Sequence, residues 1–212
     1  MGASTQPQHD RPSAPALAIA DPEAPYLAPV KRPRGLMLKF AYGYTRRRFG
    51  QVPGPLSVFS ARLPTAFTRF YMKPGMLDRK LELSAETAVL VRQLVAGTNQ
   101  CRFCMDANRW SAINRTRVRP PKLDALDTFR TSPLFSDRER AALAFAEELA
   151  EDRRVKPETF ADLAGHYSER EICEIVFLIS SEYLYNINNL GLNIGSAGMC
   201  QAGPIDSVTE QA

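Results

Sequence analysis

The segment from Ser84 to Ala96 restricts the fold of this chain more than any other, because it is apolar around most of a helical circumference. A helix that is hydrophobic on nearly every side is buried on nearly every side. It therefore has to lie at the centre of the molecule, with other elements packed around it. No stretch of the chain shows the apolar–polar alternation, bounded by hairpin turns, that is typical of β-strands. The sequence predicts an all-α bundle built around this helix.

Two further long helices are predicted from capping boxes, in which a serine is followed three residues later by a glutamate. Ser136 and Glu139 form one such pair, and Ser168 and Glu171 form the other, each ahead of a segment with helical apolar periodicity. Shorter helices are expected where a proline stands at a first-turn position, which is the case at Pro55, Pro64, Pro120 and Pro157.

Composition divides the chain into four parts. Residues 1–33 are rich in Pro, Ala, Ser and Gln without periodicity, which predicts a disordered tail. Residues 34–52 are expected to form a basic helix, residues 53–200 a helical domain, and residues 201–212 an irregular tail. The basic helix carries apolar side chains on one side, and we expect it to pack on the domain or on a neighbouring subunit. Attachment to an anionic membrane surface is the alternative.

Charge and length exclude several classes of protein. The first 50 residues hold eight Lys and Arg against three Asp and Glu, whereas the rest of the chain holds 19 against 20. The helical domain is therefore near neutral, which argues against nucleic-acid binding. No run of 18 uncharged apolar residues is present, so no membrane span is expected. Four cysteines do not suggest a secreted disulfide scaffold, and we expect a cytoplasmic protein.

Cys101 and Cys104 form the only Cys-x-x-Cys of the chain, at the start of a helix expected over about residues 100–115. Gly97 is expected to end the preceding apolar helix, and Asn99 to cap the next one. Both sulfurs then lie in the first turns, where unpaired N–H groups favour a thiolate. A thiolate with a second thiol three residues away can attack an oxidised substrate and then be resolved as an internal disulfide. Thiol redox chemistry is the leading hypothesis.

Two other interpretations of the cysteine pair stay open. A zinc site needs two more ligands at suitable spacing, and the remaining candidates are Cys173, Cys200, His9 and His166, which form no second pair of that kind. We therefore expect no metal and no cofactor. Alternatively, the two cysteines are small apolar side chains that point into a core, as buried free cysteines often do.

With the motif and its helical setting in place, the chain resembles the carboxymuconolactone decarboxylase family, and more specifically its AhpD-like alkylhydroperoxidase branch. The resemblance covers about residues 55–200 and is carried by the apolar helix, by Asn-Gln-Cys-Arg-Phe-Cys at 99–104, and by the segments 139–149, 167–176 and 185–194. It implies an all-α AhpD-like bundle that assembles as a homo-oligomer, namely a dimer, trimer or hexamer. In that branch eleven residues separate a Glu from the Cys-x-x-Cys that follows it, and three residues separate the Cys-x-x-Cys from a His.

The resemblance also implies roles for individual residues. Cys104 corresponds to the cysteine that attacks the peroxide, and Cys101 to the one that resolves the sulfenic acid. The relay His position is held by Asn108 and the Glu position by Val89, so both proton-handling groups are replaced. Asn108 is expected to hydrogen-bond a thiol or a water. Glu86, one turn before the Val, is a candidate assisting carboxylate, unless it only complements the helix dipole.

Three functions follow as hypotheses. The first is a thiol-dependent oxidoreductase, peroxidase-like or exchanging disulfides, with a small hydroperoxide or disulfide as substrate and another redox protein as reductant. The second is a lactone decarboxylase-like enzyme that acts on a small carboxylated ring. The third is a non-catalytic oligomeric member of the family with a binding or structural role. The helix dipole alone favours Cys101 as the more acidic thiol, whereas the resemblance assigns the attack to Cys104.

Overall fold

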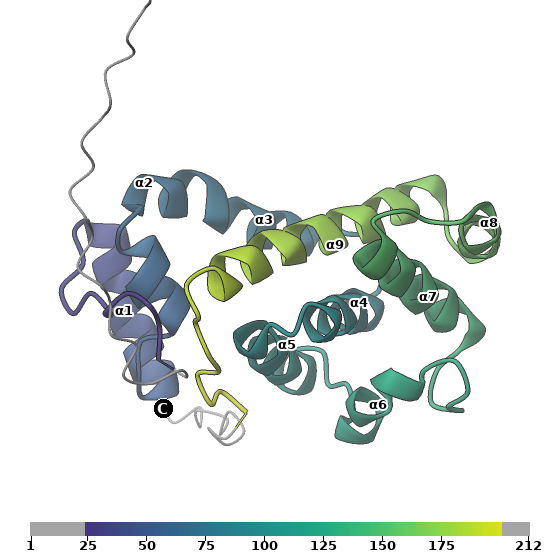
Figure 1. The fold of residues 1–212 in the computed structure, drawn as a ribbon, viewed down its shortest axis with the longest axis horizontal. Helices are drawn as coiled ribbons and strands as arrows, with labels where there is room; N and C mark the ends of the chain where they lie inside the picture. The colour runs from purple at the N-terminus through teal and green to yellow at the C-terminus, as the bar shows by residue number, and fades with distance from the viewer. Residues whose placement is uncertain (1–23, 201–212) are drawn as a thin grey trace, which may run out of the picture.

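The computed structural model describes residues 24–200, apart from the burial of Gly75 and Arg79. Every regular element in this part of the chain is helical, which confirms the all-α prediction (Figure 1). The longer helices are α1 (Leu36–Phe49), α4 (Ala85–Thr98), α5 (Arg102–Asn114), α7 (Asp137–Asp152), α8 (Pro157–His166) and α9 (Glu169–Leu190). The short ones are α2 (Pro64–Ala66), α3 (Met72–Leu77), α6 (Pro120–Asp124), the π-helical turns η1 (Pro55–Ser60) and η2 (Phe67–Tyr71), and the 3₁₀ turns η3 (Asp78–Lys80) and η4 (Leu126–Thr128).

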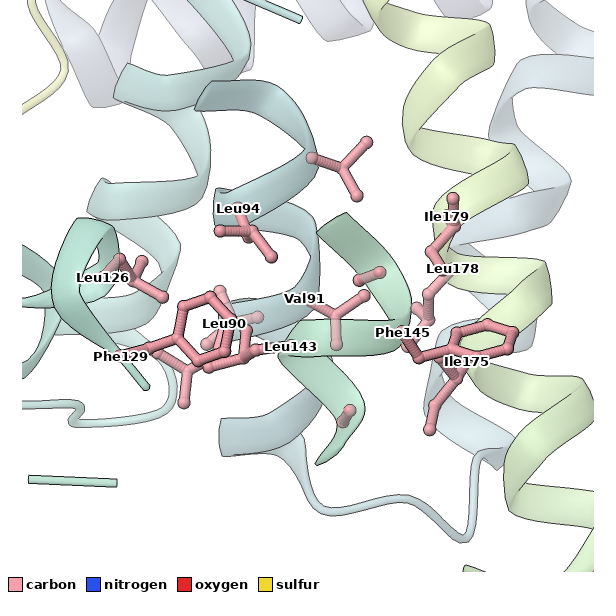
Figure 2. Packing of buried hydrophobic residues seen from close by; sticks show 14 of the residues in the cluster. Leu90, Val91, Leu94, Leu126, Phe129, Leu143, Phe145, Ile175, Leu178 and Ile179 are labelled. Carbon is pink, nitrogen blue, oxygen red and sulfur yellow. The ribbon is translucent and has the colours of Figure 1, made fainter. Parts of the chain in front are cut away.

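Helix α4 lies at the centre of the domain, as its apolar circumference predicts. It packs against α5, α7 and α9. Leu90 and Val91 of α4 are fully buried, and Figure 2 shows them among Leu143 and Phe145 of α7 and Ile175 of α9. Each such side chain contributes roughly 1.5–3 kcal/mol through its removal from water, so this cluster holds the three helices around α4.

Both predicted capping boxes are formed. The Ser136 and Ser168 side chains accept hydrogen bonds from the backbone N–H of Glu139 and Glu171, and each glutamate carboxylate accepts one from the backbone N–H of its serine. These contacts fix the starts of α7 and α9. Helix α9 then extends from α8 to the side of the molecule that holds α1, and so bridges the two ends of the domain (Figure 1).

The link between α4 and α5 differs from the prediction. Helix α4 continues through Gly97, and Asn99 is its C-terminal cap rather than the N-cap of α5. The N-cap of α5 is Cys101, preceded by Gln100 with a left-handed φ of 54°. The assignment of Asn99 as the cap of α5 was wrong because its backbone still has helical angles, φ −81° and ψ −1°, with its N–H bonded to the carbonyl of Val95. Its side-chain amide donates to Asn186 Oδ1 at 2.8 Å. The tight turn places the first cysteine directly at the start of α5.

The N-terminal part packs on the domain. Helix α1 buries Leu38 and Tyr42 beside Leu56 of η1, while the apolar side chains noted in the sequence stay exposed in this single chain. They are Leu36, Met37, Phe40 and Tyr44. Residues 24–33 form no helix but hydrogen-bond to the domain, as in the N–H of Tyr26 to the carbonyl of Leu192. Most of the predicted N-terminal tail and all of the C-terminal tail lie outside the described residues.

No helix within residues 24–200 combines the length and the apolar character needed to cross a membrane.

Candidate functional site

The two cysteine sulfurs meet at the start of α5. Cys101 Sγ and Cys104 Sγ are 2.8 Å apart, and both cysteines are unbonded thiols. A disulfide bond is about 2.0 Å long, so only a small displacement within this one turn closes the pair. Both side chains are buried, at 1% and 4% exposure. The arrangement is that of a dithiol ready to form an internal disulfide.

An amide from α9 faces the sulfurs. Asn189 Nδ2 lies 3.2 Å from Cys104 Sγ and 3.8 Å from Cys101 Sγ. Because an N–H donor stabilises a thiolate more than a thiol, this contact favours ionisation of the pair. Asn189 is almost fully buried, which holds the donor in one orientation.

A cavity of about 430 Å³ opens above Cys104. Its polar lining comes from Arg92, Asn108, Glu182, Asn188 and Asn189, and its aromatic lining from Phe59, Phe67, Tyr71, Phe103 and Tyr185. Cys101 is absent from the lining and lies behind Cys104. A molecule that enters the cavity therefore meets Cys104 first.

A buried carboxyl group, Glu182 of α9, lies beside Cys104. Its Oε1 accepts hydrogen bonds from Asn186 Nδ2 at 2.8 Å and from Asn108 Nδ2 at 3.2 Å. The Cys104 thiol also hydrogen-bonds to this side chain. Burial raises the pKa of Glu182 above its ordinary value, and the charge of Arg92 and these hydrogen bonds act in the opposite direction.

Glu182 is not among the residues predicted from the sequence, although α9 carries a signal that points to it. An acidic residue interrupts an otherwise apolar helix face, and Asn186 and Asn189 follow at positions i+4 and i+7 of the same face. Polar residues in such a stripe are rarely buried unless they bond to one another or serve a site.

The two thiols differ in acidity. The hydrogen bond with Cys101 raises the pKa of Cys104, and burial and the carboxylate of Glu182 raise it further. The contact between the two sulfurs lowers the pKa of Cys101, and the amide of Asn189 adds to this effect. Cys101 is therefore the more acidic of the two thiols, as the helix dipole suggests, and Cys104 has to lose its proton before it can attack.

The structure brings one of the two predicted assisting residues to the thiols. Asn108 lines the cavity but donates its hydrogen bond to Glu182 rather than to a sulfur. Glu86 forms an ion pair with Lys122 Nζ at 2.7 Å and does not line the cavity. Val89, at the family's Glu position, is buried in the central core.

No group of three or more His, Cys, Asp or Glu side chains gathers to hold a metal ion within residues 24–200.

A bacterial protein is a sequence relative of this chain. No protein-family model matches the sequence. The chain is 33% identical over 162 residues to YnjA, an uncharacterized protein of Escherichia coli K12, with 74% of this chain and 86% of YnjA covered.

Solved structures resemble the whole helical domain. The debrominase Bmp8 matches with a TM-score of 0.70 at 23% identity, over 83% of this chain and 94% of Bmp8. A peroxidase-related protein from Silicibacter sp. TM1040 matches with a TM-score of 0.64 at 20% identity, over 78% and 87% of the two chains. An AhpD core protein from Ralstonia eutropha JMP134 gives 0.62 at 17% identity, over 76% and 85%.

The fold with its dithiol at a helix start defines an AhpD-like helical protein. The chain belongs to the same family as YnjA, and its structural neighbours are AhpD-like proteins of the carboxymuconolactone decarboxylase family, the branch that the sequence resembles. It departs from that branch where Asn108 and Val89 stand at the relay positions.

Proposed function

We propose that this chain is a thiol-dependent oxidoreductase in which Cys104 attacks an oxidised substrate and Cys101 resolves the product as a disulfide. The observation that carries the proposal is the pair of sulfurs 2.8 Å apart, of which only Cys104 opens to the cavity. The order of attack follows from access rather than acidity, because Cys101 is the more acidic thiol but cannot reach a molecule in the cavity.

The reaction with a hydroperoxide balances with the two thiols alone. The Cys104 thiolate attacks one peroxide oxygen, the O–O bond breaks, and an alcohol leaves after it takes up a proton. The sulfenic acid on Cys104 is then attacked by Cys101, which forms the disulfide and releases water. A dithiol of another redox protein reduces that disulfide and restores both thiols.

The lining of the cavity favours a small apolar substrate. The rings of Phe59 and Tyr71 pack edge to face with centroids 5.2 Å apart, and Tyr71 lies beside Tyr185. A hydroperoxide or disulfide with an apolar or aromatic body fits such walls. A cysteine-to-alanine variant of Bmp8, whose fold is similar, was solved in complex with 2,3,4-tribromopyrrole, and this aromatic ligand supports an apolar substrate here.

The proposal includes a homo-oligomeric cytoplasmic protein. The exposed apolar side chains on α1, led by Leu36 at 85% and Phe40 at 73% exposure, support contact with a second copy. Four cysteines in 212 residues do not form the dense disulfide framework of small secreted proteins, which supports the cytoplasmic location.

A non-catalytic role is the second candidate, and the burial of both thiols favours it. It predicts that neither thiol reacts in the native protein. It would also account for the loss of the relay residues, because a binding protein has no need to move a proton.

The test is a single turnover of reduced protein with cumene hydroperoxide, followed by mass spectrometry of the cysteines. We expect the wild type to form the Cys101–Cys104 disulfide, Cys101→Ser to stop at a sulfenic acid on Cys104, and Cys104→Ser to be inert. Cys173→Ser, which removes an exposed cysteine of α9, is the matched control and should react like the wild type. Unchanged oxidation in Cys104→Ser, or thiols that react only after unfolding, contradicts the proposal.

A further inference from the structure

The proposed reaction needs a proton acceptor that the family's relay positions do not supply. The pKa of the Cys104 thiol is raised, and neither the amide of Asn108 nor the side chain of Val89 accepts its proton at neutral pH. Among the residues that line the cavity, Glu182 is the single carboxyl group. It comes from α9, whereas the family's Glu position lies on α4.

We propose that Glu182 accepts the proton of Cys104, an inference that rests on the oxidoreductase function proposed above. The carboxyl group lines the same cavity as Cys104 and is hydrogen-bonded by its thiol. A group within hydrogen-bond reach of the proton that it removes meets the first requirement for a general base.

A chain of amides holds this carboxylate in place. Asn99 Nδ2 donates to Asn186 Oδ1, and Asn186 Nδ2 donates to Glu182 Oε1, both at 2.8 Å. Asn108 adds a second donor to the same Oε1. Neither of these two amides donates to Oε2, which leaves that oxygen for the thiol proton. Asn108, at the family's His position, therefore positions the acceptor instead of acting as one.

The charged and titratable groups around Glu182 suit proton exchange. Helix α4 contributes Arg92, whose guanidinium Nη2 also forms an ion pair with Asp78 Oδ1 at 3.0 Å. Helix α5 contributes the two thiols, and α9 itself contributes Tyr185. Burial outweighs Arg92 and the amides, so the pKa of Glu182 is raised. A carboxylate with a raised pKa is a stronger base toward a thiol, because the two proton affinities lie closer together.

The step conserves atoms and charge. The proton moves from Cys104 Sγ to Glu182, and the thiolate forms a bond to one oxygen of the hydroperoxide as the O–O bond breaks. The leaving alkoxide takes the proton back from Glu182 and departs as an alcohol. Glu182 is a carboxylate again, and Cys104 is a sulfenic acid that Cys101 can resolve.

The test compares Glu182→Gln with Glu174→Gln. Glu174 is also a buried carboxylate of α9, but it accepts hydrogen bonds from the backbone N–H groups of Glu82 and Leu83, away from the thiols. The rate of Cys104 oxidation by cumene hydroperoxide is measured in single turnovers from pH 5 to pH 9. We expect Glu182→Gln to be about 10²-fold slower at pH 7, the lower end of a general base's contribution. Glu174→Gln should retain the wild-type rate.

The opposite result is equally informative. If Glu182 were only a negative charge beside Cys104, its removal would make the thiol more acidic and the reaction faster. An equal or higher rate in Glu182→Gln therefore overturns the inference, while an inert Cys104→Ser leaves the oxidoreductase function standing. Should Glu182→Gln fail to fold, Glu182→Asp carries the test. Its shortened carboxylate should slow oxidation, and an unchanged rate again overturns the inference.

Discussion

Asn189 is the residue that bears most directly on the thiolate, because its amide donates to Cys104 Sγ at 3.2 Å. Asn189→Ala removes a hydrogen bond that lowers the pKa of both thiols. We expect alkylation of the pair by iodoacetamide to shift to higher pH and to slow about fivefold at pH 7, as the loss of ~1 kcal/mol implies.

The neighbouring Asn188 provides the control for this experiment. It lines the same cavity, but its amide donates to Tyr71 Oη at 2.9 Å rather than to a sulfur. Asn188→Ala should leave the pH profile of alkylation where it is in the wild type. A shift in both variants would mean that a general change of the cavity, and not the amide donor, sets the acidity of the thiols.

Glu182 also affects the stability of the fold. Its pKa is raised in the folded protein, so between its unfolded and its folded pKa the native state binds more protons than the unfolded state. Stability from this group therefore falls as the pH rises through that window. Glu182→Gln removes this pH dependence, so its free energy of unfolding should rise relative to that of the wild type between about pH 5 and pH 8. Urea denaturation at the two values checks this, and a constant difference between the two proteins would contradict the raised pKa.

At the scale of the helices, α4 carries the core, and Leu90 tests its place. Leu90 is fully buried beside α7, and Leu90→Ala should lower the free energy of unfolding by about 2–5 kcal/mol, through lost transfer energy and the cavity left behind. Ile187→Ala, at a position 63% exposed on α9, should change it by no more than about 0.5 kcal/mol. Urea denaturation of both variants measures the difference, and similar values would place α4 outside the core.

The helices with local sequence signals were predicted, and the features that depend on distant contacts were not. The capping boxes at Ser136 and Ser168 and the apolar run of α4 are local patterns, and the structure confirms all three. The cap assigned to Asn99 failed because α4 runs up to this residue, which ends α4 instead of starting α5, and its side chain bonds to Asn186, 87 residues later. The π-helical form of η1 likewise has no local signature beyond its proline.

The same distinction runs through the candidate site. Cys101, Cys104 and Asn108 lie within eight residues of one another, so spacing alone groups them. Asn189 reaches the thiols from α9 across 85 to 88 residues of sequence, and Glu182 reaches Asn108 across 74. The sequence does not show which face of α9 turns toward α5. Glu182 and Asn189 can therefore be assigned to the site only once the helices are packed.

At the scale of the whole molecule, the outer face of α1 is the feature that the single chain leaves unexplained. Leu36, Phe40 and Tyr44 follow at intervals of four residues and so share one side of the helix, with all three exposed. The inner side of the same helix supplies Ala41 and Thr45 to the cavity above Cys104. A second copy that covers the outer face would therefore hold α1 in place as part of the cavity wall.

We expect this arrangement to link assembly to substrate selection. The double variant Leu36→Ser with Phe40→Ser should reduce the mass of the particle in sedimentation velocity, because it removes the most exposed apolar side chains of α1. With α1 no longer held, the rate of oxidation by cumene hydroperoxide should fall further than the rate with hydrogen peroxide, since only the bulky substrate contacts the apolar walls. Phe160→Ser, at an exposed position of α8 on the opposite side of the domain, should change neither mass nor rates. A double variant with the wild-type mass would show that the outer face of α1 is not in the interface. Equal losses of rate with both peroxides would show that assembly does not act through the apolar walls of the cavity.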